Sequence, residues 1–185
     1  VIGVKGIGKT HINGIISTEE AELIAVADIN EEEGKAAATK YNVQWFKDYE
    51  KMLKLKNLDA VTICTPHFLH YPLSMKALEY GKNVLVEKPM AITVRQADNM
   101  IKAARSKGLK LSVVFQGRAS PINMEIKRLI ETGELGQLYR VLMEACEFRT
   151  QSYYNQDAWR GKWATEGGGA LINQTIHNID LLQWF

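Results

Sequence analysis

The sequence predicts an α/β fold built on a doubly wound parallel sheet, followed by the start of an α+β domain with an open, mostly antiparallel sheet. Short apolar runs bounded by glycine, proline or acidic residues alternate with longer helical stretches as far as Phe115. These runs are apolar throughout, which is typical of parallel strands buried on both faces. No internal repeat or low-complexity segment interrupts the alternation.

The expected elements follow each other in a regular order. Predicted strands cover residues 1–4, 22–28, 59–64, 83–87 and 111–115. Predicted helices cover about 9–17, 30–41, 48–55, 67–80 and 93–107. Asn30 is a suitable N-cap for the second helix, and Gly81 and Gly108 are suitable residues just beyond helix ends. Parallel strands joined by helices form a sheet with helices on both faces.

The pattern changes after Gln116, and we expect a first domain over 1–117 and a second from 118 to 185. A helix is expected over 121–132, and residues 138–150 alternate as a strand with one wetter face would. The glycines at 167–169 lead into a helix expected to run to the end. Since the chain begins in a predicted strand and stops in a predicted helix, we expect a fragment lacking the extreme N-terminus and much of the second domain.

The composition indicates a globular protein, with 46% hydrophobic and 24% charged residues among 185. A net charge of +2, evenly mixed along the chain, argues against nucleic acid or a membrane surface as partner. Cys64 and Cys146 lack the spacing of a zinc ribbon or disulfide framework, which favours a reducing, cytoplasmic location. No apolar run approaches the roughly 18 residues of a membrane span.

The first candidate site is the turn after the first strand. Its expected cofactor-binding residues are Gly3, Lys5, Gly6, Ile7 and Gly8. Such a turn at a helix N-terminus can hold the pyrophosphate of a dinucleotide in a Rossmann fold, although Lys5 stands in the middle glycine position and glycines there can serve packing alone. Asp28 ends the second predicted strand, where a carboxylate accepts hydrogen bonds from ribose hydroxyls and repels a 2′-phosphate. We therefore expect NAD, with NADP as the alternative.

Two further candidates follow the third and fourth strands, at the carboxyl edge where such sheets bind ligands. Glu87 and Lys88 end the fourth strand, and a partly desolvated lysine there can share or move a proton, although a plain surface lysine fits this stretch equally well. The third strand is followed by further expected cofactor-binding residues, Thr65, Pro66, His67 and His70. We expect the two histidines to cap the helix and line the cofactor face, and no metal, because a third ligand is lacking.

The last candidate follows the three glycines. Asn173 and His177 are four residues apart, which places them on one face of a helix, and Asp180 lies near them. Histidine can accept a proton near neutral pH, and a neighbouring amide or carboxylate can fix its tautomer. The alternative is a core helix in which His177 is a hydrogen-bonded neighbour of apolar side chains.

An aromatic stretch precedes that segment and contains Tyr153, Tyr154, Trp159, Arg160 and Trp163. Its rings suit the apolar face of a sugar, and they suit packing or a dimer contact equally well. Arg160 could bind an acidic or phosphorylated substituent of a substrate.

Motifs along nearly the whole chain resemble those of the Gfo/Idh/MocA oxidoreductases, the group of glucose–fructose oxidoreductase and inositol 2-dehydrogenase. The matching stretches are GVKGIGKTH (3–11), VAD (26–28), TPHFLH (65–70), GKNVLVEKP (81–89), RASP (118–121) and GGGALINQTIHNIDLL (167–182). The resemblance implies that Lys88 is the active-site lysine and His177 the acid/base. Asn173 stands where many members carry aspartate, but an amide can still orient a sugar hydroxyl. The expected substrate-binding residues are Lys88, Arg160, Trp163, Asn173 and His177.

The resemblance implies hydride exchange between NAD(H) and a hydroxyl-bearing carbon of a sugar, inositol or related polyol, by a homo-oligomer (dimer or tetramer). His177 would accept the hydroxyl proton while Lys88 stabilises the alkoxide that develops. Two alternatives remain, a glycosidase that uses bound NAD without net oxidation and a non-catalytic, cofactor-sensing regulator. A regulator could dispense with Lys88 and His177, so their presence favours an enzyme.

Overall fold

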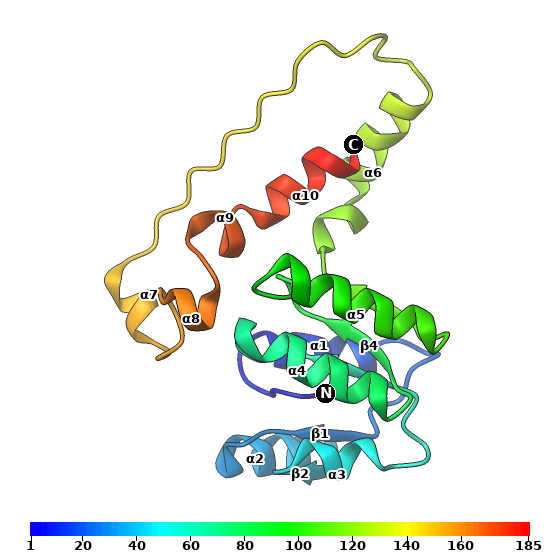
Figure 1. Ribbon diagram of the computed structural model, residues 1–185, viewed down its shortest axis with the longest axis vertical. Helices are drawn as coiled ribbons and strands as arrows, with labels where there is room; N and C mark the ends of the chain where they lie inside the picture. Colours follow the sequence, from blue (N-terminus) through cyan, green and yellow to red (C-terminus); the bar gives the residue numbers. More distant parts are fainter. The chain divides into compact units, whose positions relative to one another are not determined.

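The structure is a computed structural model that describes residues 1–185 (Figure 1). The chain folds into two compact units, Val1–Val113 and Val114–Phe185. None of the helices combines the length and the apolar composition needed to cross a bilayer.

The first unit is organised around a parallel sheet. Strand β1 (Ala25–Ala27) pairs with β2 (Gln44–Phe46), while β4 (Asn83–Val86) lies between β3 (Ala60–Ile63) and β5 (Leu111–Val113). Ile2 forms parallel bridges to Ala27 on one side and Ile63 on the other, so the first residues join the two ladders. The resulting order is β2, β1, the N-terminal segment, β3, β4, β5, and the prediction of a doubly wound parallel sheet is confirmed.

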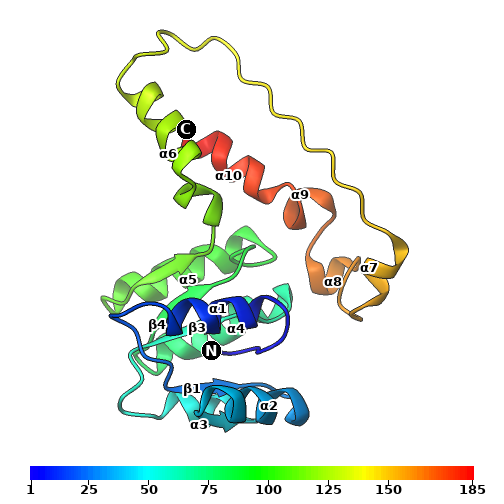
Figure 2. The same ribbon diagram turned by 180° about the vertical axis from the view of Figure 1, so that it is seen from behind.

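Helices cover both faces of this sheet. They are α1 (Ile7–Ile16), α2 (Glu31–Tyr41), α3 (Tyr49–Leu53), α4 (His67–Glu79) and α5 (Val94–Ser106). Figure 2 shows α1 in front of β3 and β4, whereas α4 and α5 lie behind them. The Asn30 side chain accepts a hydrogen bond from Glu33 N, which confirms the predicted N-cap of α2, and Thr93 caps α5 in the same way. Gly81, just past α4, has the positive φ of 74° expected for a helix-ending glycine.

Apolar side chains fill the space between the sheet and its helices. Val61, Ile63, Val84 and Val86 from the central strands are at most 3% exposed, and Met100 from α5 is fully buried against this group of residues. Each fully buried aliphatic side chain contributes about 1.5–3 kcal/mol to folding. The core therefore fixes the strand ends at the carboxyl edge of the sheet, where the predicted cofactor residues lie.

One strand of the sheet is absent from the sequence prediction. Strand β2 is only three residues long, which is too short for a recognisable pattern of buried and exposed positions, and its first residue, Gln44, is exposed. Trp45 stabilises the strand, because its ring nitrogen donates a hydrogen bond to the Asp28 backbone oxygen at 3.1 Å.

The second unit is helical. It contains the 3₁₀ helix η1 (Gln116–Ala119) followed by α6 (Pro121–Glu131), α7 (Gln151–Asn155), α8 (Trp163–Glu166), α9 (Ala170–Asn173) and α10 (Ile176–Trp184). Residues 136–150 form neither helix nor strand, and the yellow trace in Figure 1 is extended along this stretch. The strand expected over 138–150, and with it the sheet of the second domain, is therefore not observed. A strand exists only through pairing, and nothing within residues 1–185 pairs with this stretch.

The predicted single helix from the three glycines to the chain end is divided into α9 and α10. Both the backbone N–H and the hydroxyl of Thr175 bond to the Ala170 carbonyl oxygen, at 2.9 and 3.2 Å. A hydroxyl that bonds back in this way competes with the regular helix ladder. Asn173 and His177 consequently belong to different helices, and the prediction that they share one helical face is wrong.

Candidate functional site

The glycine turn between the N-terminal segment and α1 is shaped by two different requirements. A Cβ at Gly3 would lie 2.7 Å from the Cys64 oxygen, and one at Gly8 would lie 2.0 Å from the Gly3 oxygen, so both glycines serve close backbone packing. Gly6 differs, since a Cβ there would meet nothing within 4 Å. Its φ of 49° and ψ of −115° favour glycine for conformational reasons, and the space beside it is open to a ligand.

The N-terminus of α1 has the features of an anion site. No side chain caps the helix, and its first turn contains no acidic residue, so the positive end of the helix dipole is not compensated from within the chain. These features fit the pyrophosphate of a dinucleotide. Lys5 is largely exposed at 68% of its side chain, and its Nζ lies 3.6 Å from Glu33 Oε1.

Asp28 follows β1 and is fixed by backbone contacts. One carboxylate oxygen accepts a hydrogen bond from Val4 N at 2.9 Å and the other from Asn30 N at 2.8 Å. The side chain therefore bridges the glycine turn and the start of α2. An oxygen that accepts one hydrogen bond retains a second lone pair for a ribose hydroxyl, so the residue fits the expected role.

Glu87 and Lys88 directly follow β4, and a hydrogen bond between Glu87 and His11 holds this turn. Glu87 Oε1 lies 2.8 Å from Nε2 of His11 on α1, and Glu87 Oε2 accepts a hydrogen bond from the Lys88 backbone N at 3.1 Å. Burial acts to raise the pKa of Glu87, but the hydrogen bond and charge of His11, together with Lys88, outweigh it and leave the pKa below its ordinary value. The Lys88 backbone is thereby anchored to α1, the helix whose N-terminus has the features of an anion site.

His70 holds the same turn from α4. Its Nδ1 lies 2.7 Å from the Pro89 carbonyl oxygen, and its Nε2 lies 2.8 Å from the Thr65 carbonyl oxygen. Burial lowers the pKa of His70 below its ordinary value, although both carbonyl contacts act in the opposite direction. The ring therefore joins the turn after β3 to the turn after β4, and the peptide bond between Lys88 and Pro89 is cis.

The expectation that both histidines line the cofactor face needs correction. The His70 ring has no exposed surface and His67 is only 5% exposed, and both His70 nitrogens face backbone carbonyl oxygens of the chain. Thr65 and Pro66 lie at the start of α4, with Pro66 at the N-cap position. Burial and the neighbouring Glu87 raise the pKa of the Cys64 thiol to about 12, which keeps it protonated and unreactive. No three His, Cys, Asp or Glu side chains within residues 1–185 are grouped to hold a metal ion.

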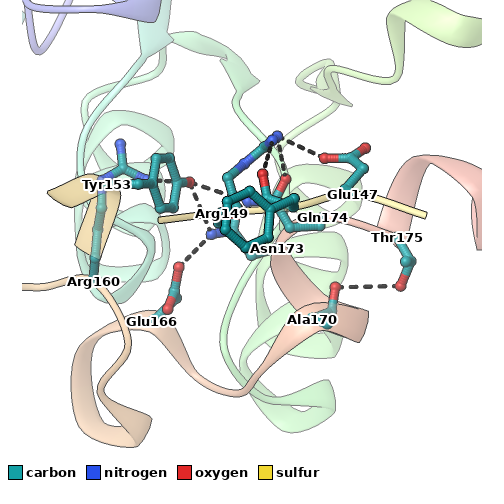
Figure 3. Close-up of polar contacts among 10 residues, drawn as sticks. Glu147, Arg149, Tyr153, Arg160, Glu166, Ala170, Asn173, Gln174 and Thr175 are labelled. Carbon is teal, nitrogen blue, oxygen red and sulfur yellow. Dashed lines mark hydrogen bonds and ion pairs between the residues drawn. The ribbon is translucent and has the colours of Figure 1, made fainter. Parts of the chain in front are cut away.

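In the second unit, a polar cluster gathers around the phenol of Tyr153 (Figure 3). Its oxygen accepts hydrogen bonds from Arg160 at 2.6 Å, Gln174 at 3.1 Å and Asn173 at 3.5 Å. The Arg160 guanidinium also lies over the rings of Tyr153 and Trp159, 4.5 and 4.6 Å from their centroids. Two predicted substrate residues, Arg160 and Asn173, are therefore brought together, whereas the Trp163 side chain, also predicted, is 81% exposed.

His177 lies on α10, where its ring meets the Phe115 ring edge-on at a centroid distance of 6.0 Å. Asp180 lies three residues further along α10, and both of its carboxylate oxygens accept hydrogen bonds from Arg118, at 2.5 and 2.8 Å. This bidentate pair ties α10 to η1.

Two residues of these clusters are missing from the sequence prediction. His11 lies one turn into α1, where its contact with Glu87 across 76 positions of sequence leaves no local signal. Glu166 precedes the three glycines and is only 2% exposed, and its carboxylate accepts hydrogen bonds from Gly161 N and from the Asn173 amide. In the sequence, Glu166 stands directly before the three glycines, and this pattern indicates the end of a helix as readily as a buried functional carboxylate.

The fold and these clusters define a dinucleotide-binding Rossmann protein with a second unit rich in polar side chains. Residues 1–115 match the family described as "Oxidoreductase family, NAD-binding Rossmann fold" of the Gfo/Idh/MocA group, and residues 123–185 match the Gfo/Idh/MocA C-terminal domain. The chain belongs to the Gfo/Idh/MocA oxidoreductase family, and its first unit is the family's NAD-binding domain.

Several relatives are sugar or polyol dehydrogenases. D-glucoside 3-dehydrogenase of Escherichia coli is 32% identical over 93% of this chain and 48% of its own length, and inositol 2-dehydrogenase of Salmonella typhimurium is 26% identical over 100% and 53%. Among solved structures, the WlbA dehydrogenase of Bordetella pertussis in complex with NADH and UDP-GlcNAcA is 36% identical, with a TM-score of 0.94 over 99% of this chain and 55% of that one. The chain spans about half the length of these relatives.

Proposed function

We propose that the protein is an NAD-dependent dehydrogenase that oxidises a hydroxyl group of a nucleotide-linked acidic sugar. The observation that carries the dehydrogenase assignment is the turn containing Lys88, which is held by His11 through Glu87 and by His70 through Pro89. A lysine backbone fixed from two helices beside a dinucleotide site suits a group that must contact a reacting atom.

The substrate class rests on the second unit. Arg160 is 20% exposed at its side chain, and its guanidinium is positioned by the rings of Tyr153 and Trp159. A planar guanidinium binds carboxylate and phosphate groups with two parallel hydrogen bonds. The similarity to the dehydrogenase solved with NADH and UDP-GlcNAcA, a nucleotide-linked acidic sugar, supports the same class here.

Bound NAD would accept the hydride, and the residues of this chain would handle the proton and the charge. We propose that His177 accepts the hydroxyl proton, because an imidazole can do so near neutral pH. Lys88 would donate a hydrogen bond to the substrate oxygen as negative charge develops on it. Asn173, whose side chain has both donors and an acceptor, would orient the hydroxyl.

The cofactor would be held by the features described above. The uncapped N-terminus of α1 would bind the pyrophosphate, and Asp28 would accept hydrogen bonds from the ribose and disfavour the 2′-phosphate of NADP. We also propose a cytoplasmic homo-oligomer. The free cysteines Cys64 and Cys146 suit a reducing compartment, and exposed apolar side chains such as Phe148, at 84%, suit an interface.

The test uses the full-length protein with NAD and a panel of substrates, and follows the absorbance of NADH. The panel contains UDP-linked uronates, free uronates, neutral UDP-sugars, inositols and aldoses. We expect NADH formation with UDP-linked uronates and a loss of about 10²–10³-fold in kcat for Lys88→Ala, the range for removing one hydrogen-bond donor from a developing oxyanion. Lys102→Ala, at an exposed position of α5, is the matched control and should retain turnover. NADH formation with neutral sugars alone would contradict the substrate class.

A further inference from the structure

Glu166 is a buried acidic residue to which neither the sequence motifs nor the proposed chemistry assigns a role. It ends α8 and is 2% exposed. One carboxylate oxygen accepts a hydrogen bond from Gly161 N at 2.6 Å. The other accepts one from Nδ2 of Asn173, and Figure 3 shows this contact. Both oxygens thus face nitrogen donors, which is the arrangement that suits an ionised carboxylate.

This contact fixes the orientation of the Asn173 amide. An amide has one end that only donates and one that only accepts, and here the NH₂ end is directed at Glu166, with the Tyr153 oxygen 3.5 Å from the same nitrogen. Asn173 is itself 7% exposed, so a flipped amide would place its oxygen against the Glu166 carboxylate in a nearly dry environment. The carboxylate therefore selects one of the two possible amide orientations.

We propose that Glu166 is a positioning residue that orients Asn173 toward substrate, and that it requires residue 173 to be uncharged. The 166–173 pair then carries one negative charge, located on Glu166. The functional part of this inference rests on the proposed dehydrogenase activity, because it assumes that Asn173 touches the substrate. The charge requirement at position 173 does not depend on that activity.

Several charged side chains of the second unit surround Tyr153, which contacts Asn173. Arg160 donates a hydrogen bond to the Tyr153 oxygen, which in turn contacts Asn173. Arg160 also donates a hydrogen bond to Asp157 at 3.1 Å, and this carboxylate offsets part of the positive charge of the guanidinium. Arg149 lies over the Tyr153 ring at 5.3 Å and is paired with Glu147. Because Glu166 and Asn173 are both almost fully buried and in direct contact, a second carboxylate at position 173 would have to share a proton with Glu166.

The experiment compares the full-length wild-type protein with Asn173→Asp, Glu166→Gln and the double variant Glu166→Gln/Asn173→Asp, which exchanges acid and amide. Asn155→Asp is the control, because it introduces the same charge at an exposed position of α7. Two quantities are measured across a pH series, namely kcat/KM with the substrate that the wild type oxidises and the midpoint temperature of unfolding.

We expect Asn173→Asp to lose roughly 10- to 100-fold in kcat/KM near pH 8, the loss that corresponds to one hydrogen bond involving a charged group. Its activity and its unfolding temperature should recover toward acidic pH, where the pair takes up a proton. Glu166→Gln should lower kcat/KM at all pH values. The double variant should recover most of both quantities near pH 8, and Asn155→Asp should match the wild type.

A double variant no more stable and no more active than Asn173→Asp near pH 8 would overturn the inference. So would an Asn173→Asp variant whose activity and unfolding temperature follow those of the wild type at every pH. If the wild type oxidises none of the sugars and inositols used to test the proposed function, that function is wrong, and the charge requirement at position 173 is not affected. The unfolding temperatures still decide whether position 173 must be uncharged.

Discussion

Replacing His70 by leucine removes the ring that joins two turns at the carboxyl edge of the first-unit sheet. In the folded protein its nitrogens lie 2.7 and 2.8 Å from the carbonyl oxygens of Pro89 and Thr65. The lowered pKa means that the ring is neutral at neutral pH and carries one N–H, so it donates one hydrogen bond at a time. Leaving a buried carbonyl without its donor costs about 1–3 kcal/mol, and we expect the free energy of unfolding to fall by that amount.

The loss of the His70 contact should also lower the reaction rate, because the Pro89 carbonyl that the ring holds belongs to the residue after Lys88. We expect kcat to fall along with stability in His70→Leu, while His70→Gln, which retains an N–H donor of similar reach, recovers part of both. Urea denaturation followed by circular dichroism gives the free energy of unfolding, and NADH absorbance gives kcat. A His70→Leu protein with wild-type stability and wild-type kcat would refute the role assigned to this ring.

Three further perturbations test the cofactor site and its supports. Gly6→Ala should weaken NAD binding and destabilise the protein by about 1–3 kcal/mol, since an alanine there is strained at φ 49°; Gly14→Ala in the same helix, with open space and no positive φ, should stabilise it by about 0.5–1 kcal/mol. Glu87 has a folded pKa below its ordinary 4.5, so its stabilisation is present above that pH and is lost as pH falls through the folded value. The stability of Glu87→Gln, measured by urea titration over a pH series, should therefore decline less on acidification than that of the wild type. Asp28→Asn should narrow the preference for NAD over NADP, measured as the ratio of kcat/KM values, by about tenfold, equivalent to ~1.4 kcal/mol.

The first unit could be predicted well from sequence because its signals are local. Asn30 caps α2 through an atom three residues away, and the buried strands are continuous apolar runs. The Gly81 turn likewise depends only on its own backbone conformation. Where the relevant contact was non-local, the prediction was incomplete. The hydrogen bond between His11 and Glu87 spans 76 residues, and the sequence near either residue does not indicate this contact.

The second unit was harder to predict because its structure depends on side-chain competition and on pairing. The Thr175 hydroxyl divides a helix that the apolar pattern describes as continuous. The alternation over 138–150 indicates a strand, but a strand needs a partner, and none is present within residues 1–185. Asn173 was singled out as a departure from the family pattern, whereas the neighbouring Glu166 that explains its environment became visible only in three dimensions.

We propose that this protein transfers hydride from a carbinol carbon to NAD, and isotopic labelling tests this proposal most directly. The full-length protein is incubated with NAD and a UDP-linked uronate deuterated at its ring carbons, and the reduced cofactor is analysed by mass spectrometry. We expect the wild type to form NADH that carries one deuterium, and we expect Lys88→Ala to lose this product. Reduced cofactor without deuterium, or none at all despite measurable NAD binding, would contradict it.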